Sequence, residues 1–212
     1  MTSAAGKTVR EGSAAKRATI LAAARELFLT DGYDRTSVDA VSARAQVSKR
    51  TVYDYFGDKQ ALLLAVVEQA GRSLLGTLRT TLDEELPVGG DLEAGLIGFC
   101  TRIATSAFGS SDYVTLSRLQ STAAAHLPDV RDHWIATAPE ELIAERLAEF
   151  ARAGMLAAPD PALAADHFMA LTFLLAQEKL GPAASADGAA VREVLRQGVR
   201  AFLRAYAPVA RS

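Results

Sequence analysis

The chain has 212 residues, half of them hydrophobic, and a formal net charge of −2 at pH 7. This length and composition suit a small domain and a larger one, and the near-neutral charge would be unusual for a protein whose whole surface binds nucleic acid. The charge is unevenly distributed: residues 1–60 contain ten Lys and Arg against seven Asp and Glu, whereas residues 61–212 contain thirteen against eighteen. We therefore expect any DNA-binding surface in residues 1–60.

Neither the N-terminal segment nor any apolar run indicates export or a membrane. Residues 1–17 mix charged and small side chains without the continuous apolar stretch of a signal peptide. The longest apolar runs, 61–67 and 168–176, are far shorter than the ~20 residues that span a bilayer. The single cysteine, Cys100, has apolar neighbours and is interpreted as a buried hydrophobic residue rather than a redox-sensing thiol. The sequence predicts a cytoplasmic protein with no membrane partner.

The first predicted elements are an arm and a helix. Residues 1–12 are polar and small, and we expect a disordered arm there. A helix is predicted over 13–31, where apolar residues recur at helical spacing from Ile20 to Phe28. Gly32 is positioned to end this helix.

The segment 36–62 contains two short helical patterns joined by a tight connection, and the second is rich in basic, hydroxyl and aromatic side chains. Thr36 is predicted to cap the first helix, with Asp39 reaching back to the cap amide. Ser48 is predicted to cap the second helix. Only 46–48 separate the two patterns, so the helices must cross steeply, as in a helix-turn-helix that lays its second helix in a major groove.

A fourth helix is predicted from Asp58 to about Glu85, where Pro87 ends it. Beyond it the apolar spacing stays helical, without the alternation of a strand. The fold class is therefore all-α, with an N-terminal three-helix helix-turn-helix DNA-binding domain over 13–60 and a larger helical ligand-binding and dimerisation domain over 61–212. The later helices are predicted over 91–108, 112–126, 129–137, 139–153, 160–180 and 187–206.

The N-terminal residues follow a specific order: Gly32-Tyr33, Thr36-Ser37-Val38, Ala45-Gln46-Val47-Ser48, Thr51-Val52-Tyr53-Asp54-Tyr55-Phe56, Lys59 and Leu62-Leu63. In this order they resemble the N-terminal signature of the TetR family of bacterial transcriptional regulators. Gln46 stands where that family usually has Gly. If this turn position has a positive φ, Gln is strained relative to Gly by roughly 1 kcal/mol. A second stretch, from Leu116 through Asp160 to Phe168, resembles the C-terminal domain of the AefR-like subgroup.

The resemblance implies a homodimer that pairs through its last two long helices into a four-helix bundle and binds a pseudo-palindromic double-stranded DNA operator. The sequence offers apolar faces wider than one neighbouring helix would cover. The alternative, that these residues only close the core of one chain, stays open. The residues concerned are Phe168, Leu171, Thr172, Leu175, Val191, Val194, Leu195, Val199, Phe202 and Leu203.

Lys49 and Tyr53 lie one turn apart on the exposed face of the reader helix and are predicted to read bases, since a Lys can donate to guanine O6 or N7. Arg50 either reads guanine or pairs with Asp54 at i+4, and both interpretations stay open. The remaining candidates would bind backbone phosphates. Capping alone is the alternative for two of them, Thr36 and Ser48, and a core position beside Phe56 is the alternative for Tyr55. The phosphate candidates are Thr36, Ser37, Ser48, Thr51, Tyr55 and Lys59.

The middle helices offer aromatic and polar side chains suited to an apolar ligand pocket with a few polar anchors. No catalytic signature or phosphate loop is present, and Pro128 interrupts the helix between His126 and His133, so no enzyme, metal or cofactor is predicted. The sequence predicts a ligand-responsive regulator, most simply a repressor released by a small hydrophobic or amphipathic effector. The alternative is a nucleoid-associated or structural DNA-binding protein of the same fold without a ligand. The candidate ligand contacts are Phe99, Arg102, Phe108, Tyr113, Arg118, His126, Trp134 and His167.

Overall fold

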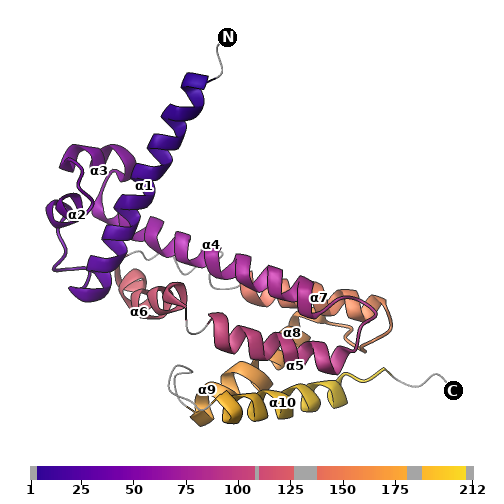
Figure 1. Ribbon diagram of the computed structural model, residues 1–212. Coiled ribbons are helices and arrows are strands. Elements are labelled where there is room, and N and C mark those ends of the chain that lie inside the picture. The colour runs from indigo at the N-terminus through magenta and orange to yellow at the C-terminus, as the bar shows by residue number, and fades with distance from the viewer. Residues whose placement is uncertain (1–3, 108–109, 127–137, 181–187, 209–212) are drawn as a thin grey trace. The chain divides into compact units, whose positions relative to one another are not determined.

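The computed structural model describes residues 4–107, 110–126, 138–180 and 188–208, and every regular element in these ranges is helical, as the sequence predicts (Figure 1). The helix predicted over 129–137 lies outside the described residues. The chain forms two compact units. The first comprises Met1–Gly71 and Thr115–His133, and the second comprises Arg72–Val114 and Trp134–Ser212.

The first unit contains the helix-turn-helix. Its helix α1 begins at Ala4 rather than at Ser13 and so includes most of the segment for which a disordered arm is predicted. Alanine, lysine, arginine and glutamate in that segment favour the helix. The helices of this unit are α1 (Ala4–Thr30), α2 (Val38–Arg44), α3 (Lys49–Phe56), the start of α4 (Lys59–Glu85) and most of α6 (Ser111–His126).

Helix α2 is capped by Ser37, not by Thr36. The Ser37 hydroxyl accepts a hydrogen bond from the Ala40 amide at 3.1 Å. Thr36 is buried, and its hydroxyl lies 3.2 Å from the carbonyl of Leu27 and 2.8 Å from that of Gly32. The prediction that Thr36 caps the helix is therefore wrong, because its hydroxyl ties the end of α1 to the following turn.

The turn between α2 and α3 places Gln46 in the left-handed region, with φ 55°. The amide of Gln46 donates to the carbonyl of Ala43 at 3.2 Å, and the amide of Val47 donates to that of Ser42 at 3.0 Å. This pair of bonds is the Schellman arrangement, whose residue after the C-cap is usually Gly. The positive φ considered for this position is thus confirmed, and Gln46 carries the strain that the sequence predicts.

We expect Gln46→Gly to raise the free energy of unfolding by about 1 kcal/mol, because glycine adopts this φ without the steric penalty of a Cβ. Urea denaturation followed by circular dichroism measures the change. Gln46→Ala is the matched control, since alanine keeps the Cβ and should give no such gain. Equal stabilisation by both substitutions would mean that the side chain of Gln46, and not its backbone conformation, is unfavourable.

The second unit is built around an aromatic core. Phe99 and Phe168 lie with ring centroids 6.3 Å apart, Phe173 meets both edge-on, and Phe202 packs against Phe168 at 5.3 Å. Such tilted and edge-on pairs are the favoured aromatic arrangements. The helices of this unit beyond α4 are α5 (Leu92–Arg102), the π-helical turn η1 (Ile103–Ala107), α7 (Ala138–Arg152), α8 (Pro161–Met169), the π-helical turn η3 (Ala170–Leu174), α9 (Leu175–Leu180) and α10 (Gly188–Ala205).

The predicted helix over 160–180 is one helical run that contains the π-helical turn η3, and α10 packs closely against this turn. A Cβ added at Gly198 of α10 would lie 2.0 Å from the carbonyl oxygen of Leu171 and 2.8 Å from its carbon. Real side chains do not approach a backbone this closely. Gly198 therefore sets the distance between the two helical segments.

Part of the apolar surface considered for dimerisation belongs to the core of the single chain. Phe168, Thr172, Leu195, Val199 and Phe202 are all buried. These five residues therefore close the core of one chain, which is the alternative that the sequence left open. The residues of the same segments that stay half-buried or exposed are Leu171, Leu174, Leu175, Val191, Val194 and Leu203.

Cys100 is fully buried in this core, as predicted. Burial raises the pKa of its thiol far above the usual range, although a hydrogen bond with Thr172 acts in the opposite direction. A thiol in this setting stays protonated and unreactive. The structure therefore favours the structural interpretation of Cys100 over a redox sensor.

Helix α4 is long and apolar enough to cross a membrane by composition alone. Its residues Leu62, Leu63, Val66 and Val67 are buried inside the protein, however. Buried apolar side chains along a long helix are expected of a core helix in a soluble protein.

Candidate DNA interface and ligand pocket

The reader helix α3 begins at a well-formed cap. The Ser48 hydroxyl accepts a hydrogen bond from the Thr51 amide at 3.1 Å and lies 2.8 Å from the Thr51 hydroxyl. Val52 is buried on the inner face of the helix, and Tyr53 is 43% exposed. Capping by Ser48 is confirmed, and it leaves the outer face of α3 free to carry polar contacts.

Two cations stand on the outer face of α3 in different surroundings. The Lys49 ammonium is 3.0 Å from one carboxylate oxygen of Asp39 and 3.1 Å from the other, and this hydrogen-bonded carboxylate raises the pKa of Lys49. Arg50 lies 3.9 Å from Asp54, and its side chain is 90% exposed. Arg50 is thus only weakly held, whereas Lys49 is engaged by a carboxylate from α2. The predicted capping role of Asp39 is not seen, because its carboxylate faces Lys49.

Two of the predicted phosphate contacts are engaged within the protein. The Tyr55 hydroxyl donates to Ser13 at 2.9 Å, and the Tyr55 ring lies 6.3 Å from that of Phe56. The Lys59 ammonium sits 4.2 Å from the centroid of the Tyr33 ring, a cation–π contact, and donates to the carbonyl of Asp34. Both side chains are half-buried, so a phosphate would have to compete with these contacts.

Thr36 is withdrawn from the candidate DNA contacts. Its side chain is 3% exposed and its hydroxyl donates to two backbone carbonyls, so its O–H group is not available to a phosphate. Ser37 is exposed and Thr51 is half-buried, and both remain candidates together with Ser48. These hydroxyl groups lie at the N-termini of α2 and α3, where the partial positive charge of a helix favours phosphate.

The last residue of α6, His126, belongs to the same unit as the helix-turn-helix. Its Nε2 lies 3.2 Å from a carboxylate oxygen of Asp34, and its ring lies 4.5 Å from that of Tyr33. Gln60 of α4 donates to the His126 carbonyl at 3.2 Å. His126 therefore links α6 to the turn after α1 and to the start of α4, a role that its prediction as a ligand contact does not describe.

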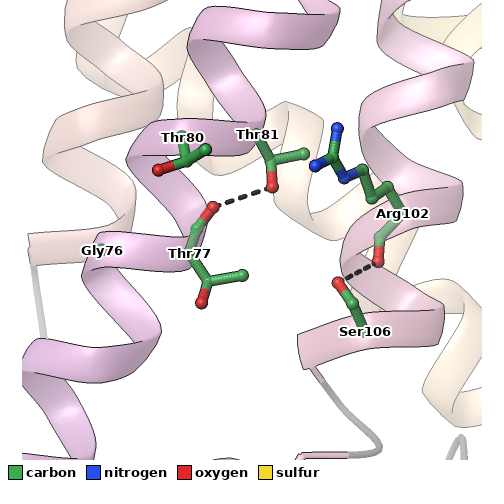
Figure 2. A pocket seen from close by; sticks show the side chains of 6 residues that line it. All are labelled: Gly76, Thr77, Thr80, Thr81, Arg102 and Ser106. Atoms are coloured by element: carbon green, nitrogen blue, oxygen red, sulfur yellow. Dashed lines mark hydrogen bonds between the residues drawn. The ribbon is translucent and has the colours of Figure 1, made fainter.

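A hollow of about 380 Å³ in the second unit is the candidate ligand pocket, and Figure 2 shows Thr77, Thr80 and Thr81 on one helix with Arg102 and Ser106 on the neighbouring one. Gly76 completes the lining. Arg102 is a predicted ligand residue, and it is also ion-paired with Glu84 and Glu85 at 2.5 and 3.1 Å. These pairs raise its pKa.

Hydroxyl-bearing residues and Arg102 line this hollow, although apolar atoms make up more of its surface than polar atoms, and none of the described lining residues is one of the aromatic side chains that the sequence predicts there. The Thr81 hydroxyl donates to the Thr77 carbonyl, and the Ser106 hydroxyl donates to the Arg102 carbonyl, as the dashed lines in Figure 2 indicate. Hydroxyls that bond back to their own helix keep their lone pairs as acceptors. The hollow therefore offers acceptor oxygens beside a guanidinium group.

The other predicted ligand residues are dispersed. Phe99 is fully buried in the core, and the His167 imidazole lies 2.7 Å from the hydroxyl of Tyr206. Tyr113 is half-buried and Arg118 is exposed, and neither lines the hollow. Phe108 and Trp134 lie outside the described residues. Within the described ranges no group of three potential metal ligands comes together.

A capped reader helix with exposed polar side chains, set in a helix-turn-helix and followed by a separate helical unit, defines a DNA-binding transcriptional regulator. Comparison with known families agrees. The model of bacterial regulatory proteins of the TetR family matches residues 20–66, and that of the AefR-like transcriptional repressor C-terminal domain matches residues 94–208. The chain belongs to the TetR family, whose members are DNA-binding regulators, often repressors, and not enzymes.

Curated relatives match mainly over part of their length. The chain is 35% identical over 83 residues to the HTH-type transcriptional activator FasR of Mycolicibacterium smegmatis, a match that covers 37% of this chain and 38% of that protein. It is 37% identical over 73 residues to the DNA-binding transcriptional repressor TetR of Mycobacteroides abscessus, covering 32% and 38%. The chain thus matches well under half the length of each.

Solved structures match over nearly the whole chain. A putative TetR-family regulator from Mesorhizobium loti has a TM-score of 0.81 at 24% identity, with 92% of this chain and 98% of that one covered, and it supports the fold. The flavonoid-responsive regulator FrrA has a TM-score of 0.71 at 28% identity, with 93% and 100% covered. The all-helical fold and the family assignment therefore rest on independent comparisons.

Proposed function

We propose that the protein is a homodimeric, ligand-responsive repressor that binds a pseudo-palindromic operator and is released by a small amphipathic effector. The observation that carries the proposal is the reader helix α3, capped at Ser48 and presenting Lys49, Arg50 and Tyr53 outward. Two such helices in a two-fold dimer would read two half-sites about one helical turn apart. A regulator of this kind works beside the chromosome, so the protein is cytoplasmic.

The threonine-lined hollow supports a response to a ligand. Three of its residues, Thr77, Thr80 and Thr81, lie on α4, and the same continuous helix begins at Lys59 in the helix-turn-helix unit. A ligand that binds one position of α4 better than another shifts the protein toward that state. The relative FrrA is flavonoid-responsive. Flavonoids combine aromatic rings with hydroxyl groups, which suits a lining of hydroxyl oxygens and one guanidinium, and we extend the effector class to molecules of that chemistry.

Repression is favoured over activation by the match of residues 94–208 to the AefR-like repressor domain. A nucleoid-associated protein of the same fold would bind DNA without a ligand. The hollow on α4 and α5 favours the regulator over this alternative.

The experiment selects double-stranded DNA from a random pool with the full chain and then measures fluorescence anisotropy on the selected duplex. We expect a pseudo-palindrome, and we expect a flavonoid or related amphipathic compound to raise the melting temperature and weaken binding to that duplex together. At a hundred times Kd such a ligand adds about 2.7 kcal/mol to the stability.

Thr80→Val provides the control for the site, since it removes a hydroxyl from the lining at unchanged shape. It should reduce the response to the compound and leave DNA affinity without the compound unaltered. A compound that stabilises the protein but leaves affinity for the duplex unchanged would contradict release by an effector. Selection of no preferred sequence would contradict operator recognition.

A further inference from the structure

The ion pair between Asp39 and Lys49 joins two helices across the turn of the helix-turn-helix. Both carboxylate oxygens of Asp39, in the first turn of α2, lie within 3.1 Å of the ammonium at the first position of α3. Both side chains are more than half exposed, at 67% and 51%. The pair therefore stands on the surface and is accessible to an approaching duplex.

The charge at this point of the surface is compensated. A lone Lys would attract any backbone phosphate, whatever the base sequence, and such contacts supply most non-specific affinity. With a carboxylate at 3.0 Å, a phosphate gains attraction from Lys49 and loses nearly as much through repulsion by Asp39. Lys49 consequently adds little to binding along a random duplex.

A guanine edge is a different acceptor. Its O6 and N7 atoms are uncharged, so the carboxylate does not repel them, and they accept hydrogen bonds from a Lys in the major groove. An ammonium has three donors, so it can serve Asp39 and a base edge at the same time. The ion pair thus suppresses the contact of Lys49 with backbone phosphate, which carries no sequence information, and permits its contact with a base edge, which does.

Arg50 provides the contrast within the same helix. Its nearest carboxylate, Asp54, is 3.9 Å away, and its side chain is 90% exposed, so its charge is much less compensated. We propose that Asp39 is a specificity-determining residue of the DNA interface, which withholds the Lys49 ammonium from backbone phosphates and so lowers affinity for non-operator DNA. This inference rests on the proposed reading of DNA by α3.

The test compares wild type, Asp39→Asn, Lys49→Ala and the double variant by anisotropy on the selected and a scrambled duplex across a salt series. Asp39→Asn should tighten binding to the scrambled duplex about tenfold, because an exposed charge contact is worth a few-fold and the dimer has two. The slope of log K against log salt should steepen by about 0.9 per subunit, as expected for one added phosphate contact. Affinity for the selected duplex should change less, so the preference for it should fall.

The double variant decides the mechanism. If Asp39 acts through Lys49, Asp39→Asn should have no further effect once Lys49 is alanine. An equal gain on scrambled DNA in both backgrounds would overturn the inference, because Asp39 would then repel phosphate by itself. If Asp39→Asn kept the wild-type preference for the selected over the scrambled duplex, the inference about Asp39 would be overturned as well. Operator recognition by the wild type would be unaffected by that result.

Failure of the proposed function has a separate signature, since the wild type would then prefer no duplex at all. Asp39→Ser, which also removes the charge, repeats the measurement with a second side chain. Thermal unfolding of each variant verifies that the helix-turn-helix is folded.

Discussion

Gly198→Ala is expected to destabilise the protein strongly. The added methyl group would lie 2.0 Å from the carbonyl oxygen of Leu171, and the contact is with backbone, so no side chain can rotate away. Overpacking of this kind costs about 1–3 kcal/mol or more, and the higher helix propensity of alanine, about 1 kcal/mol, does not offset it. A net loss of about 2 kcal/mol, at about 2–4 °C per kcal/mol for a chain of this size, should lower the melting temperature by roughly 4–8 °C.

The matched control is Gly76→Ala in α4. A Cβ at Gly76 meets nothing within 4 Å, so the same substitution should raise stability by about 0.5–1 kcal/mol. Differential scanning fluorimetry compares the two variants directly. A Gly198→Ala protein as stable as wild type would mean that α10 does not approach the π-helical turn η3 as closely as described.

Leu174→Asp is expected to convert the proposed dimer to a monomer and to abolish operator binding. Leu174 is 61% exposed, and its neighbours Leu171 and Leu175 are half-buried, so this segment offers apolar surface that the single chain does not cover. If a second copy covers it, an aspartate there is buried without a partner, which costs several kcal/mol in each subunit. The dimer dissociation constant should therefore rise by at least about a thousandfold.

Sedimentation velocity measures the assembly, and anisotropy on the selected duplex measures its consequence for DNA. Val88→Asp is the control, because Val88 is similarly exposed at 51% but lies in the turn between α4 and α5. It should leave the dimer intact. A wild-type monomer in sedimentation, or a Leu174→Asp protein that still dimerises, would contradict pairing through this surface. Phe202→Asp is unsuitable for the same purpose, since Phe202 is buried in the core of its own chain and its loss would unfold the protein.

Features that depend on neighbours in sequence are predictable from the sequence alone. The cap at Ser48 follows from a hydroxyl residue placed just before an apolar helical pattern. The positive φ of Gln46 follows from its place in a turn where the TetR family usually has Gly. The choice between Thr36 and Ser37 as cap is not predictable in this way. Both are hydroxyl residues, and burial of Thr36 against the end of α1 decides between them.

Features that depend on packing between distant segments escape sequence reasoning. Asp39 and Lys49 are ten residues apart, on different helices, and only the crossing angle of α2 and α3 brings them together. The contact between Gly198 and Leu171 depends on the approach of two helices that the sequence predicts separately. Among the predicted pocket residues that the structure describes, Arg102 is the one that lines the hollow, because aromatic side chains such as Phe99 are buried in the core.

The burial of Cys100 has a practical consequence for spectroscopy. It is the only cysteine in the sequence, and its thiol is enclosed and protonated. A cysteine introduced at an exposed site would therefore be the only thiol to react with a maleimide or a nitroxide reagent. The side chain of Arg50 is 90% exposed, so an Arg50→Cys variant could carry a spin label there while Cys100 stays in place. Pulsed electron resonance would then report the distance between the two reader helices of a dimer, before and after an effector is added.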